Sequence, residues 1–194
     1  MINKSRLSLI MLVAVFFGPF LAAWAVVNHG QDYIPLGKAA RGELIFPTIA
    51  LKPFTLDSLS DGTLDETVFK GRWTYVTISG SRCEAACQQS LYKMRQVRLT
   101  QGKNIGRVQR LIILTDRDTV DQFKAILGEH QGLKVVFEPA QNKHGILAQL
   151  DKPEENGIYL VDPLGNWFLQ YAHDVNPSDM RKDLTKLMLS SQIG

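Results

Sequence analysis

The chain has 194 residues, of which 45% are apolar and 21% are charged, and its formal net charge is +3. This is an ordinary globular composition, sufficient for one domain with an appendage. No nucleic-acid-binding motif is present, which argues against the class of nucleic-acid-binding proteins.

The N-terminal segment has the composition of a membrane-spanning helix. Lys4 and Arg6 precede Leu7–Val27, an uncharged run long enough, at about 1.5 Å per residue, to cross a hydrocarbon core of about 30 Å. The positive charges predict that residues 1–6 stay in the cytoplasm and that the rest is exported, giving a single-pass inner-membrane protein with a periplasmic domain. A cleaved signal peptide ending near Ala23-Trp-Ala25 is the alternative. The length of the run favours an uncleaved anchor.

A tether over residues 28–46, with several glycines and a proline, is predicted to join this anchor to a domain over residues 47–192. Within the domain, Pro47–Leu56 predicts a short extended segment that leads into a turn at residues 60–62. Trp73–Ser79 is rich in aromatic and β-branched residues and predicts a strand.

The only two cysteines, Cys83 and Cys87, follow this strand with the spacing C-x3-C. Gly80 and Ser81 end the strand, and the pattern then becomes helical. At about 100° per residue, a single helix face carries Cys83, Cys87, Leu91, Met94 and Val97. The spacing therefore predicts two neighbouring thiols at the start of a helix, at the exposed end of its buried face.

This placement favours reactive thiols over a merely structural disulfide. A helix N-terminus carries about half a positive charge and unpaired N–H groups, which favour a thiolate over a thiol. Arg82 acts in the same direction, whereas Glu84 opposes it. A thiolate attacks disulfides and binds soft metal ions. A structural disulfide is the alternative, although closing so short a loop stabilises a domain little.

The remaining segments predict strands that alternate with helices. Leu111–Leu114 is a continuous apolar run typical of a central strand covered on both faces. The further predicted elements are a helix near Val120–Leu127 capped by Asp118 or Thr119, a strand over Lys134–Phe137, a short helix over His144–Leu150, a hairpin of Gly157–Val161 and Asn166–Tyr171 around a turn at Asp162–Gly165, and a last helix from Asn176-Pro177 to about Leu189. This order predicts an α/β sandwich with a mixed sheet.

Every charged residue from Lys93 to Arg110 is basic. The run is either a solvated helix face and loop or an electropositive patch that faces an anionic membrane surface or an acidic partner.

The exported part resembles the Sco/SenC family of membrane-anchored, copper-handling proteins of cytochrome c oxidase assembly. The resemblance extends from about Phe46 to Leu189. It rests on Gly71–Val76, Cys83-x3-Cys87, Asp116–Thr119 and Tyr159–Gly165. It implies a thioredoxin-like fold, copper as a candidate cofactor bound by Cys83 and Cys87, and a cytochrome c oxidase subunit or another assembly factor as the partner.

The chain departs from the family at one copper ligand. The family adds a histidine a few residues before the tyrosine of the Tyr-Leu-x-Asp strand, and Glu154 occupies this position here. A carboxylate is a hard ligand, whereas a cuprous ion prefers thiolate and imidazole. His144 and His173 are the other candidates, and the third ligand stays unknown.

Three functions are compatible with these residues. The first is a thiol–disulfide oxidoreductase in which Cys83 attacks and Cys87 resolves the mixed disulfide. The second is a copper chaperone with two thiolates and a third ligand outside the family pattern. The third is a non-catalytic assembly factor that docks a partner and carries an inert disulfide. The first needs only the two cysteines, so the missing histidine leaves it intact.

Overall fold

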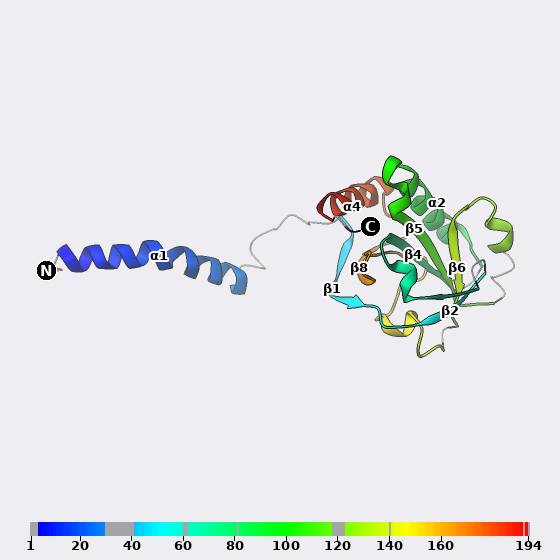
Figure 1. Cartoon of the computed structure of the whole chain (residues 1–194), viewed down its shortest axis with the longest axis horizontal. Helices are drawn as coiled ribbons and strands as arrows, with labels where there is room; N and C mark the ends of the chain where they lie inside the picture. Colours follow the sequence, from blue (N-terminus) through cyan, green and yellow to red (C-terminus); the bar gives the residue numbers. More distant parts are fainter. Residues whose placement is uncertain are drawn as a thin grey trace. The chain divides into compact units, whose positions relative to one another are not determined.

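The structure, a computed structural model, describes residues 4–29, 41–59, 62–80, 82–117, 123–139, 141–191 and 193. It divides into two units, Met1–Ala39 and Ala40–Gly194 (Figure 1). The helices are α1 (Lys4–His29), α2 (Ala85–Leu99) and α4 (Pro177–Ser190), with η1 (Glu66–Phe69), η2 (Gly102–Arg107) and η3 (Leu147–Gln149) as 3-10 helices. Residues 123–126 are also helical. The strands are β1 (Glu43–Ala50), β2 (Thr55–Ser58), β3 (Gly62–Asp65), β4 (Trp73–Ser79), β5 (Val108–Leu114), β6 (Leu133–Phe137), β7 (Ile158–Val161) and β8 (Asn166–Tyr171).

The first unit contains α1, whose large apolar side chains between Met11 and Trp24 are exposed. In the part of the chain that the structure describes, no helix combines the length and the apolar character needed to cross a bilayer. The membrane anchor stays a prediction.

The second unit is built on one mixed sheet with the strand order β1-β8-β7-β4-β5-β6-β2-β3. Strands β4, β5 and β6 run parallel to one another, and the outer strands pair antiparallel. Every side chain of β4 and β5 is buried, as expected of parallel strands covered on both faces. The predicted α/β sandwich with a mixed sheet is confirmed.

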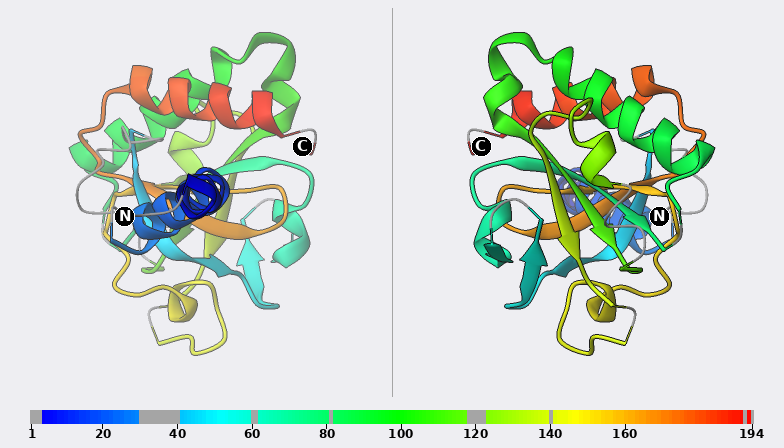
Figure 2. Two further views of the ribbon diagram at one scale, coloured as in Figure 1. Left: turned by 90° about the vertical axis from the view of Figure 1, so that its left-hand side faces the viewer. Right: turned by 90° about the vertical axis from the view of Figure 1, so that its right-hand side faces the viewer.

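Helices α2 and α4 lie side by side over one face of this sheet (Figure 2). Tyr75 of β4 and Leu184 of α4 belong to the apolar cluster under these helices. Val76, the next residue along β4, points to the other face, where it packs in a cluster with Phe69 and Trp167. The alternation along the strand therefore places one core on each side of the sheet.

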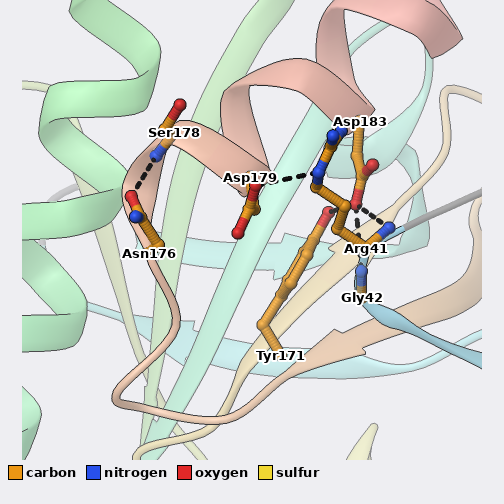
Figure 3. A network of polar contacts seen from close by, with 7 residues as sticks. All are labelled: Arg41, Gly42, Tyr171, Asn176, Ser178, Asp179 and Asp183. Atoms are coloured by element: carbon orange, nitrogen blue, oxygen red, sulfur yellow. Dashed lines mark hydrogen bonds and ion pairs between the residues drawn. The ribbon is translucent and has the colours of Figure 1, made fainter.

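Two local predictions at the C-terminal end are confirmed. Strands β7 and β8 form the hairpin, and the Asp162 carboxylate accepts the N–H groups of Leu164 and Asn166, both at 2.9 Å. The last helix begins at Pro177, where the Asn176 side chain accepts the N–H of Ser178 at 2.9 Å (Figure 3).

Other segments differ from the predictions. The helix predicted over His144–Leu150 is only the short 3-10 helix η3, and the buried Glu138 carboxylate accepts the N–H groups of Ile146 and Leu147 at 3.1 and 2.9 Å. Strand β1 starts at Glu43, inside the segment assigned to the tether. Most of the tether, the centre of the turn at residues 60–62 and the predicted caps Asp118 and Thr119 lie outside the described residues.

A buried carboxylate fastens the start of the domain to its last helix. Asp183 of α4 accepts the backbone N–H groups of Arg41 and Gly42 at 2.8 and 3.0 Å and the Tyr171 hydroxyl at 3.0 Å (Figure 3). Burial, with Tyr75 and Asp183 adding to it, raises the pKa of Tyr171, so the hydroxyl stays a donor. A Cβ at Gly42 would lie 2.6 Å from the Tyr171 ring, so only glycine permits this close approach.

We expect Asp183→Ala to lower the free energy of unfolding by about 2–4 kcal/mol, because two buried donors and one part-buried donor lose their acceptor. Urea unfolding of the full chain measures this loss. Asp179→Ala is the matched control: its ion pair with Arg41 spans 2.9 Å between side chains that are 36% and 50% exposed, so the expected loss is below about 1 kcal/mol. Equal losses in the two variants would contradict this assignment.

Candidate redox site

Cys83 and Cys87 form a disulfide between the end of β4 and the first turn of α2. Their Cα atoms are 5.1 Å apart. Helix α2 begins at Ala85, with Glu84 as its N-cap, so Cys87 is the third helical residue and Cys83 precedes the helix. The predicted position of both cysteines at the junction of strand and helix is therefore confirmed, although Cys83 precedes the helix and only Cys87 lies on its predicted face. The predicted buried face is confirmed for Cys87, Leu91, Met94 and Val97.

The disulfide is buried, whereas the sequence predicted thiols at an exposed helix end. Cys83 is 6% exposed and Cys87 is 2% exposed. Both pack in an apolar cluster with Ile112 and Leu114 of β5 and Phe123. The prediction is wrong because the first turn of α2 lies over the sheet, where side chains from distant segments cover the sulfur atoms. Cys83 keeps the larger exposed area of the two.

The N-terminus of α2 faces the disulfide without a side-chain cap. Glu84 makes no capping hydrogen bond with its carboxylate. The first N–H groups of the helix are therefore not satisfied by this residue, and they favour negative charge on a nearby sulfur. Gln88 of α2 donates from its side chain to the Cys83 carbonyl at 3.1 Å, which fixes the backbone before the helix.

A second loop, residues 153–157, lies against the cysteine junction. The N–H of Asn156 donates to the Ile78 carbonyl of β4 at 2.8 Å, and Ser90 of α2 donates to the Asn156 carbonyl at 2.7 Å. The Glu155 carboxylate accepts the N–H of Gly80 at 3.0 Å. This loop therefore joins the end of β4 to α2 beside the disulfide.

Glu155 was missed by the sequence analysis, which selected its neighbour Glu154. The side chain of Glu154 is exposed, and its backbone N–H donates to the Tyr159 hydroxyl at 2.5 Å. Burial raises the pKa of Tyr159. The pair of consecutive glutamates was the sequence feature that could have pointed to Glu155. The loop conformation, with Asn156 at a φ of 62°, decides which of the two glutamates faces Gly80.

The candidates for a third metal ligand do not join the cysteines. His144 and His173 are exposed. The N–H of His144 donates to the Asn142 side chain, and the His173 carbonyl accepts from Lys93. Among the described residues, no three His, Cys, Asp or Glu side chains come together to hold a metal ion.

These donors fit a cuprous ion only in part. Reduction of the disulfide would supply two soft thiolates, but the described part of the chain adds no third side chain to them. The structure therefore brings together the two cysteines and places the loop at residues 153–157 beside them.

Comparison with known proteins places this site in a thioredoxin-like domain. A family model described as transmembrane-like, thioredoxin-like, C-terminal domain matches residues 73–191, more than half of the chain. No curated protein matches the sequence.

Solved structures of similar fold include Sco and Dsb proteins. Copper-bound ScoI from Arabidopsis thaliana is 20% identical, with a TM-score of 0.56 over 73% of this chain and 99% of that chain. BsSco, a Sco-family cytochrome c oxidase assembly protein described for a disulfide switch, is 19% identical, with a TM-score of 0.54 over 74% and 96%. A DsbF homologue from Corynebacterium diphtheriae is 12% identical, with a TM-score of 0.59 over 79% and 96%. These likenesses establish the fold, and the predicted thioredoxin-like fold and Sco/SenC resemblance are confirmed at this level.

We expect Glu155→Ala to speed reduction of the disulfide by dithiothreitol about tenfold, because a hydrogen bond to a charged group that holds the end of β4 is lost. Alkylation of released thiols, followed over time in the full chain, measures the rate. Glu154→Ala removes the same charge one residue away and should keep the wild-type rate. Equal rates in both variants would show that Glu155 does not hold this junction.

Proposed function

The chain belongs to the family of transmembrane-like, thioredoxin-like C-terminal domains, and we propose that it is a thiol–disulfide oxidoreductase acting through Cys83 and Cys87. The disulfide between these cysteines, at the junction of β4 and α2, is the observation that carries the proposal. The disulfide switch described for BsSco and the fold shared with the DsbF homologue support it.

The proposed reaction moves two electrons from the reduced cysteine pair to a disulfide in a partner. The Cys83 thiolate attacks one partner sulfur, and the S–S bond of the partner breaks to release its other sulfur as a thiolate. The Cys87 thiolate then attacks the Cys83 sulfur and releases the second partner thiolate. The partner disulfide is reduced, the Cys83–Cys87 disulfide forms, and an external dithiol reductant must restore the reduced pair.

The division of roles follows from the position of each sulfur. Cys83 lies before the helix and is the more exposed of the two, so it is the sulfur that a partner reaches. Cys87 is almost fully buried under the first turn of α2, where it contacts the cluster of β5 residues and attacks only within the molecule. A partner reaches the buried Cys83 only if the backbone after β4 moves, and the hydrogen bond from the Gly80 N–H to the Glu155 carboxylate opposes this movement.

We expect reduced Cys87→Ser, treated with glutathione disulfide, to accumulate a stable glutathione adduct on Cys83, because the resolving thiol is absent. Mass spectrometry of the intact full chain measures the adduct. Reduced Cys83→Ser should react at least about tenfold more slowly, since its remaining thiol is buried. Equal reactivity of the two variants, or a stable adduct only on Cys87, would contradict the assigned roles.

We propose that the domain works outside the cytoplasm, held at the inner membrane by residues 7–27, on a cytochrome c oxidase subunit or another assembly factor. The uncharged run Leu7–Val27 behind Lys4 and Arg6 supports the anchor. The description of BsSco as an oxidase assembly protein supports the partner class. In an oxidising compartment such a pair needs a reductant to stay active.

A periplasmic reporter fused after Gly194 should be active, and the chain should stay in the membrane after alkaline carbonate extraction. Its intact mass should include residues 1–27. Replacement of Phe16 and Phe17 by lysine should abolish membrane retention, because charges at the centre of a spanning helix cost about 2.5–3.5 kcal/mol each. An inactive reporter, or a mass that begins near Ala25, would exclude an uncleaved anchor with this orientation.

Copper binding is the second candidate function, favoured by the shared fold with copper-bound ScoI and by two soft sulfur donors. It predicts that the reduced chain binds one cuprous ion in competition with bicinchoninic acid. The variant Cys83→Ser, Cys87→Ser should lose this binding. If the reduced wild-type chain does not compete for the ion, the copper candidate is removed and the oxidoreductase proposal is unaffected.

A further inference from the structure

A cavity of about 430 Å³ lies between the end of α2, strand β5 and the loop before β6. Arg95 and Arg98 line it from α2, and Arg110 lines it from β5. The remaining lining residues are Leu99, Gly128, Glu129 and Gln131. Helix α2 has 15 residues and is about 22 Å long at about 1.5 Å per residue. The cavity therefore lies at the opposite end of α2 from the disulfide.

Arg110 is a buried cation whose hydrogen-bonding capacity is mostly unused. It is 2% exposed, and its Nη2 donates to the Gln131 carbonyl at 2.6 Å. Its Nε and Nη1 are buried and have no hydrogen-bond partner in the described part of the chain. Arg110 alternates with Leu111, which packs on the other face, so its side chain lies in the layer beneath α2. Such unsatisfied buried donors are rare and indicate a missing partner.

The charges around Arg110 are not balanced. Burial, followed by repulsion from Arg98 and Arg95, lowers the pKa of Arg110 to about 10. Within the described residues, no carboxylate forms an ion pair with any of the three arginines, and the one acidic lining residue, Glu129, is exposed. An anion at this place would relieve the repulsion and supply acceptors.

A neighbouring cavity of about 660 Å³ extends the same positive surface. Arg98 lines both cavities, and Arg72, Lys134 and His130 line the second. His130 is 8% exposed, and its buried Nδ1 also has no partner among the described residues. Among the residues that the structure describes, none that lines this second cavity is acidic. Arg95, Arg98 and Arg110 belong to the basic run from Lys93 to Arg110. Part of this run therefore lines the two cavities and does not form only a solvated helix face.

We propose that Arg95, Arg98 and Arg110 form a binding site for a phosphate group. A phosphate offers at least three acceptor oxygens and up to two negative charges, which matches several guanidinium groups better than the two oxygens of one carboxylate do. The C-terminal end of α2 carries about half a negative charge, which repels an anion. Each arginine contributes a whole positive charge, so the net interaction with an anion is attractive. The phosphate belongs either to free phosphate or to a lipid headgroup.

The test uses the full chain in a non-ionic detergent and measures its thermal unfolding midpoint. The two probes are inorganic phosphate, exchanged for chloride at constant ionic strength, and water-soluble dihexanoyl phosphatidic acid. A ligand that binds only the folded state raises the midpoint with increasing concentration. We expect this rise for at least one probe. The variant Arg95→Gln, Arg98→Gln should weaken the apparent affinity at least about tenfold, because charge-assisted hydrogen bonds are lost.

The variant Arg181→Gln, Lys182→Gln is the matched control, since it removes two exposed charges from α4 outside both cavities. It should keep the wild-type response. Arg98 also donates from Nε to the Val108 carbonyl at 2.8 Å. If the double variant does not fold, Arg95→Gln alone, which changes an exposed side chain, provides the same comparison.

A rise with both probes supports the site with free phosphate as a sufficient ligand, and a rise with the phosphatidic acid alone supports it with a lipid headgroup as the source. The proposal is overturned if neither probe raises the midpoint, or if the Arg95 and Arg98 variants respond as the wild type does. An oligoglutamate peptide is measured as a third probe, and a rise produced by this peptide alone also overturns the proposal, in favour of an acidic protein partner. None of these outcomes depends on the redox function of the cysteines.

Discussion

Burial of both faces of β4 and β5 is the constraint on which the rest of the domain depends. Every side chain of both strands is buried, and their backbone groups pair with each other and with β7 and β6. Two such strands leave no exposed face for chemistry, so polar and reactive groups can lie only where the chain leaves the sheet. The polar and reactive groups of the domain are therefore found at the two ends of these strands.

At the carboxyl end of β4, the chain passes through Gly80 into the disulfide and the first turn of α2. At the amino end of β5, Arg110 lies beneath the last turns of the same helix. Helix α2 connects the buried disulfide to the buried Arg110, and a loop is hydrogen-bonded beside each of them. The loop at residues 153–157 accepts the N–H of Gly80 beside the disulfide, and the loop before β6 accepts a hydrogen bond from Arg110. The proposed thiol chemistry and the proposed anion site are thus separated by the length of one helix.

The parts of this arrangement that depend on neighbouring residues could be predicted from the sequence. The spacing of Cys87, Leu91 and Met94 identified the buried face of α2, and Asp162–Gly165 identified the hairpin. The likeness to the Sco/SenC family correctly indicated the thioredoxin-like fold.

The parts that depend on distant contacts could not be predicted. Burial of the disulfide requires Ile112, Leu114 and Phe123, which are separated from it by loops and strands. The pairing of β1 with β8 begins at Glu43, in a segment with little periodicity that indicated a tether, and only its end at Ile49 and Ala50 falls in the segment predicted to be extended. Arg110 follows Val108 and Gln109 as part of β5, but a charged residue beside an apolar run marks the end of a strand in a sequence pattern. Only the packing of α2 over the sheet shows that it is buried.

The reduction potential of the Cys83–Cys87 pair tests the central claim most directly. The full chain would be equilibrated in glutathione and dithiothreitol buffers of defined potential, and its free thiols would be counted after alkylation. A pair that exchanges electrons with partner disulfides should have a potential above about −300 mV, within the range of the known thiol–disulfide oxidoreductases. A pair that stays oxidised well below about −300 mV would be an inert structural disulfide, and it would contradict the proposed function.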